Sequence, residues 1–314
     1  MTAIALPLSG YAGWTFLQRT MESQKALLQK DAQLQREEAH FREKIGSITK
    51  AEDLVKDRQL LKVALGAYGL QDDLANRYFI RKVLEDGTLD NSDLANRLAD
   101  KSYAALSSGF GFGDYAVPRT QLSDFADKII AQYRQRSFEV AVGEVNGDYR
   151  LALNAERELP ALASGSMTED AKWYTVLGSE PLRRLFETAF GLPASFGAID
   201  IDAQLGIIKD RAARYFGDDS LSQFSQPDQQ DKLIRQFLLR AELASLSAGT
   251  ISRAAKTCTI RSLFPMLPAS IIGLLLLSVW LMWRGAVPEP LQQAAGGLLP
   301  YLPLLLAVPA SGIM

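Results

Sequence analysis

The chain contains 314 residues, of which 22% are charged, and its formal net charge is −2. A balance so close to neutral gives no whole-chain attraction to nucleic acid, so no nucleic-acid partner is expected. One histidine and one cysteine exclude an intrachain disulfide and any zinc site built only from these two residue types. We therefore predict no metal site, no cofactor and no small-molecule ligand.

Residues 1–48 are predicted to form an extended arm followed by one long amphipathic helix. Residues 14–45 contain neither proline nor glycine, and Leu27, Leu34 and Phe41 recur at intervals of seven. Apolar residues at this spacing form one stripe along a helix, which packs either on the chain's own core or on a partner. The residues nominated for contact with a partner open this helix and are Tyr11, Trp14, Leu17 and Met21.

The chain between residues 49 and 250 is predicted to be helical throughout. Apolar residues there are spaced by three and four, and no alternating run is long enough for a strand. Capping residues such as Thr168, Ser179 and Asp200 mark the starts of new helices. The fold class is therefore predicted to be all-α.

Two parts of this helical body resemble each other, and the matching blocks occur in the same order along the chain. Such order indicates a duplicated helical unit, although chance similarity between amphipathic helices is the alternative. We divide the body into a first unit, 49–160, and a second unit, 161–250. The matched blocks are RQLLKVALGAYGL (58–70) with EPLRRLFETAFGL (180–192), and KIIAQYRQR (128–136) with KLIRQFLLR (232–240).

Each copy places a glycine and a leucine directly after an apolar stripe of helical period, and an aspartate further on. The glycine is predicted to end the helix in the left-handed conformation, and the leucine to fold back onto the last turn. The aspartate is predicted to cap the next helix. These residues are Gly69, Leu70 and Asp90 in the first copy and Gly191, Leu192 and Asp200 in the second.

Three motifs suggest a binding site and fail a closer test. The glycine-rich run 107–113 follows no predicted strand and is followed by Asp114, so we predict a loop that its phenylalanines hold to the body, and not a phosphate site. The acidic run 86–93 lacks the glycine and glutamate of a calcium loop. His40 lies in a charged helix and is predicted to be solvated. We nominate no catalytic residues and predict that the chain is not an enzyme.

Residues 251–314 are predicted to form a basic linker and a hydrophobic helical tail. Residues 264–283 carry no charge and end at Arg284, and a helix of this length is about 30 Å long, enough to cross a bilayer. More basic residues precede this run than follow it, which favours a cytoplasmic leading side. A shifted reading frame is an alternative origin of the tail. The predicted membrane residues are Phe264, Ile272, Leu276, Trp280 and Trp283.

Three blocks of the sequence are similar to the uncharacterised bacterial family called domain of unknown function 1217. They are GYAGW (10–14), SFEVAVGEVNGDYRLALNAERELP (137–160) and AFGLPASFGAIDIDAQL (189–205). Members of that family occur in alphaproteobacteria and are often encoded among flagellar genes. The resemblance implies a helical fold and a role linked to the flagellum, and it supplies no catalytic residues. The hydrophobic tail departs from the family pattern, because members tend to end soon after the last helix.

Together these patterns predict an all-α protein with a long N-terminal helix, two similar helical units and a hydrophobic C-terminal helical tail. We expect a non-enzymatic interaction protein that binds protein partners of flagellar assembly or motility, in the cytoplasm or at the inner membrane. The alternative is a membrane-tethered cytoplasmic adaptor held by the tail. A helical enzyme whose carboxylates converge only in the fold is a third hypothesis.

Overall fold

The computed structural model describes residues 4–257, and for residue 194 and residues 247–257 it describes the backbone alone. Within this range all regular structure is helical, which confirms the predicted fold class. Contacts divide the chain into two units, Met1–Ser247 and Ala248–Met314, and the account below concerns the first. The predicted membrane residues 264–283 lie outside the described residues.

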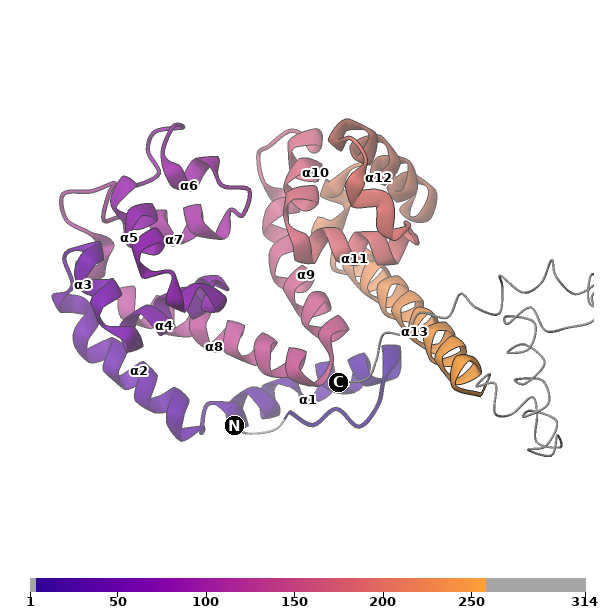
Figure 1. Ribbon diagram of the computed structural model, residues 1–314, viewed down its shortest axis with the longest axis horizontal. Coiled ribbons are helices and arrows are strands. Elements are labelled where there is room, and N and C mark those ends of the chain that lie inside the picture. The colour runs from indigo at the N-terminus through magenta and orange to yellow at the C-terminus, as the bar shows by residue number, and fades with distance from the viewer. Residues whose placement is uncertain (1–3, 258–314) are drawn as a thin grey trace, which may run out of the picture. The chain divides into compact units, whose positions relative to one another are not determined.

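Helices follow one another through short connections (Figure 1). The α-helices are α1 (Gly10–Leu28), α2 (Ala32–Lys44), α3 (Ala51–Lys56), α4 (Arg58–Tyr68), α5 (Arg77–Asp86), α6 (Leu94–Arg97), α7 (Ser102–Phe110), α8 (Phe125–Val145), α9 (Gly147–Ser164), α10 (Glu169–Gly178), α11 (Glu180–Phe190), α12 (Ile201–Phe216) and α13 (Pro227–Thr257). Short 3-10 helices connect some of them: η1 (Ile45–Ser47), η2 (Gln71–Ala75), η3 (Arg119–Gln121), η4 (Ala194–Ala198) and η5 (Leu221–Ser225).

Buried apolar side chains gather in two separate cores within the first unit. The first core is built from α2, α3, α4, α5, α7 and the start of α8. The second is built from α1, the end of α8, α9 to α11, η4, α12, η5 and α13. Helix α9, which the sequence division assigned to the first helical unit, therefore packs in the second core.

Helix α8 belongs to both cores. Ile129 and Tyr133 in its first half are buried in the first core, whereas Phe138 and Val142 in its second half are buried in the second. The change of core lies between Tyr133 and Phe138, so one continuous helix carries both. Helix α8 therefore connects the two cores without a break in the helix.

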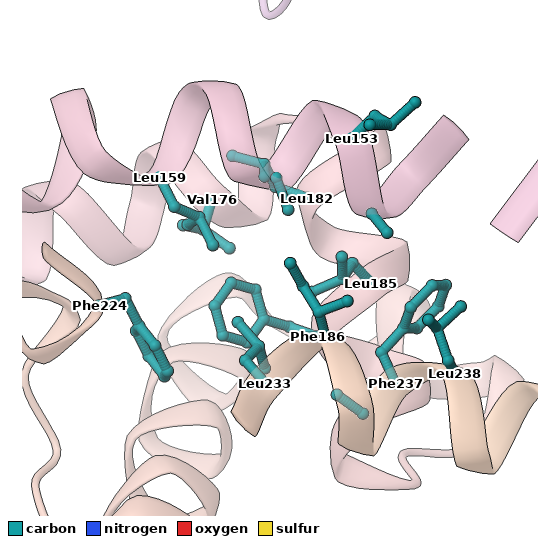
Figure 2. Close-up of a cluster of buried hydrophobic side chains, with 14 of the residues drawn as sticks. Leu153, Leu159, Val176, Leu182, Leu185, Phe186, Phe224, Leu233, Phe237 and Leu238 are labelled. Atoms are coloured by element: carbon teal, nitrogen blue, oxygen red, sulfur yellow. The ribbon is translucent and has the colours of Figure 1, made fainter. Parts of the chain in front are cut away.

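Aromatic side chains fill the centre of the second core. Figure 2 shows leucines, valine and phenylalanines from α9, α10, α11, η5 and α13 converging there. The Phe186 ring on α11 lies 5.3 Å from Trp173 and 5.5 Å from Phe224, both in edge-to-face geometry. Such contacts stabilise aromatic pairs beyond the area that they bury.

The single long helix predicted for residues 14–45 is wrong, because the structure breaks it in two. Helix α1 ends at Leu28, and α2 begins at Ala32 after a turn. Asp31 starts the second helix, since its carboxylate accepts hydrogen bonds from the N–H groups of Gln33 and Leu34. The break lets the apolar stripe follow two cores, with Leu17 buried in the second and Phe41 in the first.

The helix ends predicted at the two matched glycines are confirmed. Gly69 ends α4 at φ 80° and Gly191 ends α11 at φ 64°, both in the left-handed region. The N–H of Leu70 bonds the carbonyl of Leu65 at 2.9 Å, which folds the chain back onto the last turn. The N–H of Leu192 makes the corresponding bond to a carbonyl of α11 at 2.8 Å.

The two predicted capping aspartates behave differently. Asp200 caps α12, because its carboxylate accepts from the N–H groups of Asp202 and Ala203. Asp90 does not cap a helix, and that prediction is wrong. Its carboxylate accepts from the N–H and hydroxyl of Ser92 within a turn, and this turn delays the next helix until Leu94.

Two of the rejected motifs have structural roles in the first core. The start of the glycine-rich run closes α7, and the rings of Phe110 and Phe112 stack against each other in the core. The prediction that His40 is solvated is wrong. Its Nε2 lies 2.7 Å from the carboxylate of Asp57, the residue that caps α4, so the pair joins α2 to α4.

Candidate interaction surface

The four residues nominated for partner contact lie on the face of α1 that packs against the chain's own core. Trp14 is 4% exposed and Leu17 is fully buried, while Tyr11 and Met21 pack partly buried against the same core. A partner cannot reach Trp14 or Leu17 while this packing holds. The structure therefore corrects the nomination, in favour of the alternative that the stripe packs on the chain's own core.

Buried charged side chains join helices in the first core. Glu37 on α2 accepts hydrogen bonds from Lys62 on α4 and from the hydroxyl of Tyr133 on α8. Burial raises the pKa of Glu37, but the hydrogen bonds from Lys62, Tyr133 and Gln33 outweigh burial, so its pKa lies below the usual value. The neighbouring Glu38 binds Arg134 of α8 at 2.7 Å. These carboxylates link three helices.

A second buried acid joins α8 to α9. Glu139 is 3% exposed, and both its oxygens accept from the guanidinium of Arg157, at 2.8 Å and 3.1 Å. A side chain at this burial requires such partners, because an unpaired buried charge is strongly destabilising. Arg136 lies 3.8 Å from the same carboxylate. Burial and the adjacent Arg157 lower the pKa of Arg136.

A third acid, Glu169 at the start of α10, binds the start of η5. It accepts from the Nζ of Lys172 at 2.9 Å and from the N–H of Leu221 at 2.7 Å. Burial raises the pKa of Glu169, but hydrogen bonds from Ser222, Lys172 and the N–H of Leu221 lower it to about 2. Like the other two clusters, this one connects separate elements of the body.

Helix α12 presents one face to the core and the other to solvent. Asp200 starts the helix, and the buried residues Gln204, Ile208 and Ala212 follow at intervals of four, which is the spacing of one helical face. The opposite face, which includes Asp202, Gly206 and Asp210, is exposed. Apolar side chains just before the helix, at its start and beside this face are exposed as well: Ile199 is 41% exposed, Ile201 is 45% and Ile207 is 37%.

Two shallow hollows flank the exposed face of α12. The first, of about 420 Å³, is mostly apolar and lies between η4 and α12; its lining includes Leu192, Pro193, Phe196, Ile199 and Ile207. The second, of about 510 Å³, is acidic and lies between α12 and α10; its lining includes Asp170, Asp202, Asp210 and Asp219 with Lys209 as the one cation. We refer to η4, the exposed face of α12 and these two hollows as the α12 surface.

The acidic hollow is partly neutralised by its lysine. The Nζ of Lys209 lies 2.9 Å from Asp170 and 3.5 Å from Asp219. Asp202 accepts a hydrogen bond from the hydroxyl of Tyr174, and among the described residues no cation pairs with it. Asp170 and Asp219 are each 57% exposed. The hollow therefore keeps an excess of negative charge that faces solvent.

Gly206 separates the two hollows and lines both. It lies inside α12 and has an ordinary helical backbone. Apart from its chain neighbours and the backbone of its own helix, no described atom lies within 4 Å of the position that a Cβ would take there. The sequence analysis did not predict this surface. The glycine inside the helix that was predicted to follow Asp200 could have indicated it, because glycine is unfavourable in a helix interior.

The described residues contain no group of three or more histidine, cysteine, aspartate or glutamate side chains that could hold a metal ion. Among the helices described between residues 4 and 257, none is long and apolar enough to cross a bilayer. The candidate site is the α12 surface, where exposed apolar side chains adjoin an apolar and an acidic hollow.

Comparison with known proteins gives two matches. The sequence model of a family described as "Protein of unknown function (DUF1217)" matches residues 67–229, a span that contains η4 and α12. The chain is also similar to the crystal structure of an Agrobacterium tumefaciens protein that was a structural genomics target, with a TM-score of 0.63 and 27% sequence identity. This similarity covers 77% of the chain and 99% of that protein. No curated protein matches the chain.

Proposed function

We propose that this chain, which belongs to the DUF1217 family of proteins of unknown function, is a non-enzymatic interaction protein that binds another protein through its α12 surface. One observation carries the proposal: Ile199 and Ile207 are exposed and line an apolar hollow of about 420 Å³. Exposed apolar side chains gathered in one place and rimmed by charge are typical of protein interaction sites.

The contacts of three glutamates in the body support a role without chemistry. Glu37, Glu139 and Glu169 are each bonded to groups on other elements. Such carboxylates cannot leave their donors without separating packed elements. In this proposal they stabilise a scaffold and take no part in a reaction.

The proposed setting is flagellar assembly or motility. It rests on the resemblance of three sequence blocks to a family whose members are often encoded among flagellar genes. One of these blocks, residues 189–205, forms the end of α11, η4 and the start of α12. The same residues therefore supply both the family resemblance and one wall of the α12 surface.

We further propose that the body arose by duplication of one helical unit. In support, Gly69 and Gly191 end corresponding helices in the same left-handed conformation. An arginine from the next matched block lies beside each, Arg136 beside Gly69 and Arg240 beside Gly191. A superposition of the pair α4 and α8 on the pair α11 and α13 tests this. A duplicated unit requires the two helices to cross at the same angle in both copies.

The interaction role is tested by complementation in native cells. Deleting the gene should reduce the swimming halo, and the wild-type chain should restore it. The Ile207→Lys variant should fail to restore it at equal protein level and with an unchanged melting curve, because a charge would stand in the apolar hollow. Normal swimming of the deletion strain would contradict the flagellar link.

A membrane-tethered cytoplasmic adaptor is the second candidate, and one sequence observation favours it. Residues 264–283, which lie outside the described residues, carry no charge and end at Arg284, as expected of a membrane anchor. Cell fractionation tests it. The full chain should sediment with membranes after an alkaline wash, whereas a chain without residues 264–314 should not.

A further inference from the structure

Nothing within the described chain explains why position 206 of α12 is a glycine. A glycine inside a helix lowers stability relative to alanine, because it loses more backbone freedom on folding. Gly147 and Gly178 also have open space at the Cβ position, but they stand at the first and last positions of their helices. Other glycines in α-helix interiors make room for a neighbour. A Cβ at Gly66 would lie 2.6 Å from the ring of Tyr133, and one at Gly143 would lie 2.6 Å from Arg150.

At Gly206 no such neighbour exists among the described residues, since no described atom beyond its chain neighbours and the backbone of its own helix lies within 4 Å of the Cβ position. The backbone there is helical, so no left-handed conformation requires glycine either. What the glycine does provide is a notch in the exposed face of α12. Two helices can approach closely where a residue at their crossing has no side chain.

We infer that the α12 surface receives a helix of a partner protein, which crosses α12 at Gly206 and carries apolar side chains on one side and lysine or arginine on the other. The inference rests on the proposed function and names the partner of that same site. The apolar hollow, with Phe196 and Ile207 in its lining, takes the apolar side chains. The acidic hollow, with Asp202 and Asp219 in its lining, takes the basic ones.

Charge argues against a second copy of this chain as the occupant. Asp202 and Asp210 stand four residues to either side of Gly206, on the same exposed face. In a twofold contact that crosses at Gly206, each of these aspartates would face an aspartate of the other copy. Like charges in such a contact are unfavourable, whereas a basic helix is complementary to them.

Site-specific photo-crosslinking of the full chain in native cells tests the inference. The photoreactive residue replaces Ile207, and the same residue at Tyr78, which is 70% exposed on α5, serves as the control position. We expect an adduct from position 207 and not from position 78. Mass spectrometry should place its linkage within a helical segment of another protein that carries lysine or arginine beside its apolar face.

Two variants of the crosslinking chain then examine the notch and the charge. Gly206→Leu should lower the adduct yield by about tenfold or more, as expected for a bulky residue at the centre of an interface. Its melting temperature should be unchanged or higher, because leucine is a better helix former than glycine. Asp202→Asn should lower the yield and make it less sensitive to salt.

The outcomes separate this inference from the proposed function. An adduct to another protein whose yield survives Gly206→Leu, or whose linked segment is acidic or extended, overturns the inference and leaves the interaction role intact. An adduct to a second copy, or to the chain's own residues 258–314, overturns the inference by naming a different occupant. Absence of any adduct at position 207 overturns both.

Discussion

Arg240 of α13 lies against Gly191, the glycine that ends α11, so closely that a Cβ at Gly191 would overlap its guanidinium. The same guanidinium donates to the hydroxyl of Tyr215 at 3.0 Å and lies over that ring. Gly191 also has φ 64°, which L-residues rarely adopt. Two independent reasons therefore require glycine at this position, whereas at Gly69 the nearest atom of Arg136 is 3.3 Å from the Cβ position.

Gly191→Ala should therefore cost more than Gly69→Ala. Both substitutions place an alanine in the left-handed region, which costs roughly 1–2 kcal/mol. Gly191→Ala should also displace Arg240 from Tyr215, which adds about 0.5–1 kcal/mol for a lost hydrogen bond. Urea unfolding of the two variants measures the difference. Equal losses of stability would contradict the close contact between Arg240 and Gly191.

Gly206→Ala should raise stability. The alanine methyl meets no described atom beyond its chain neighbours and the backbone of its own helix, and the exchange should increase the free energy of unfolding by about 0.5–1 kcal/mol. Gly66→Ala is the matched control, because its methyl would meet the ring of Tyr133 and overpacking typically costs about 1–3 kcal/mol. A loss of stability at Gly206 would mean that the notch is filled within the chain itself.

The features that the sequence predicted correctly are those decided by neighbouring residues. The helix ends at Gly69 and Gly191 depend on a glycine, a leucine and the preceding turn, all within six residues. The all-α fold depends on apolar spacing, which is also local. Asp200 caps α12 through residues two and three positions away. In each case the residues that determine the structure are neighbours in the sequence, so the sequence pattern includes all of them.

The features that the sequence missed depend on residues far apart in the chain. The stripe with Trp14 and Leu17 suited either a partner or the chain's own core, and only the packing of α1 against residues such as Tyr149 of α9 decides between them. The break at Asp31 follows from a helix that must serve two cores. Glu37 and Tyr133, which form a hydrogen bond, are 96 positions apart in the sequence. No local sequence pattern predicts a contact between residues so far apart in the chain.

Glu139→Ala should be strongly destabilising. It would leave the guanidinium groups of Arg136 and Arg157 side by side and only about a quarter exposed, at 22% and 25%. Breaking one side of a buried pair costs about 3–5 kcal/mol when both groups are fully buried, so we expect about 2–3 kcal/mol here.

A double-mutant cycle provides the control for this prediction. Replacing Arg157 as well, in the variant Glu139→Ala with Arg157→Ala, removes both members of the pair, whereas in the single variant Arg157 keeps only its contacts with Glu158 and Asn154. The double variant should therefore lose less stability than the sum of the two single variants. Strict additivity would show that the two side chains do not interact.

Glu169 should give stability a dependence on acid pH. Its pKa is about 2 in the folded protein, below the ordinary value of 4.5, because Ser222, Lys172 and the N–H of Leu221 bond its charged form. A group whose pKa falls on folding stabilises the fold above its unfolded pKa. That contribution is therefore complete above about pH 4.5 and is lost as the pH falls towards 2.

Glu169→Gln should remove this part of the pH dependence. Between pH 6 and pH 3 the wild-type free energy of unfolding should fall more steeply than that of the variant, so the two curves should converge as the pH drops. Urea denaturation at several pH values measures both curves. Glu180→Gln, a change at another first-turn glutamate, is the control and should leave the slope unaltered. Parallel curves for wild type and Glu169→Gln would show that the contacts of Glu169 with η5 do not hold its charge.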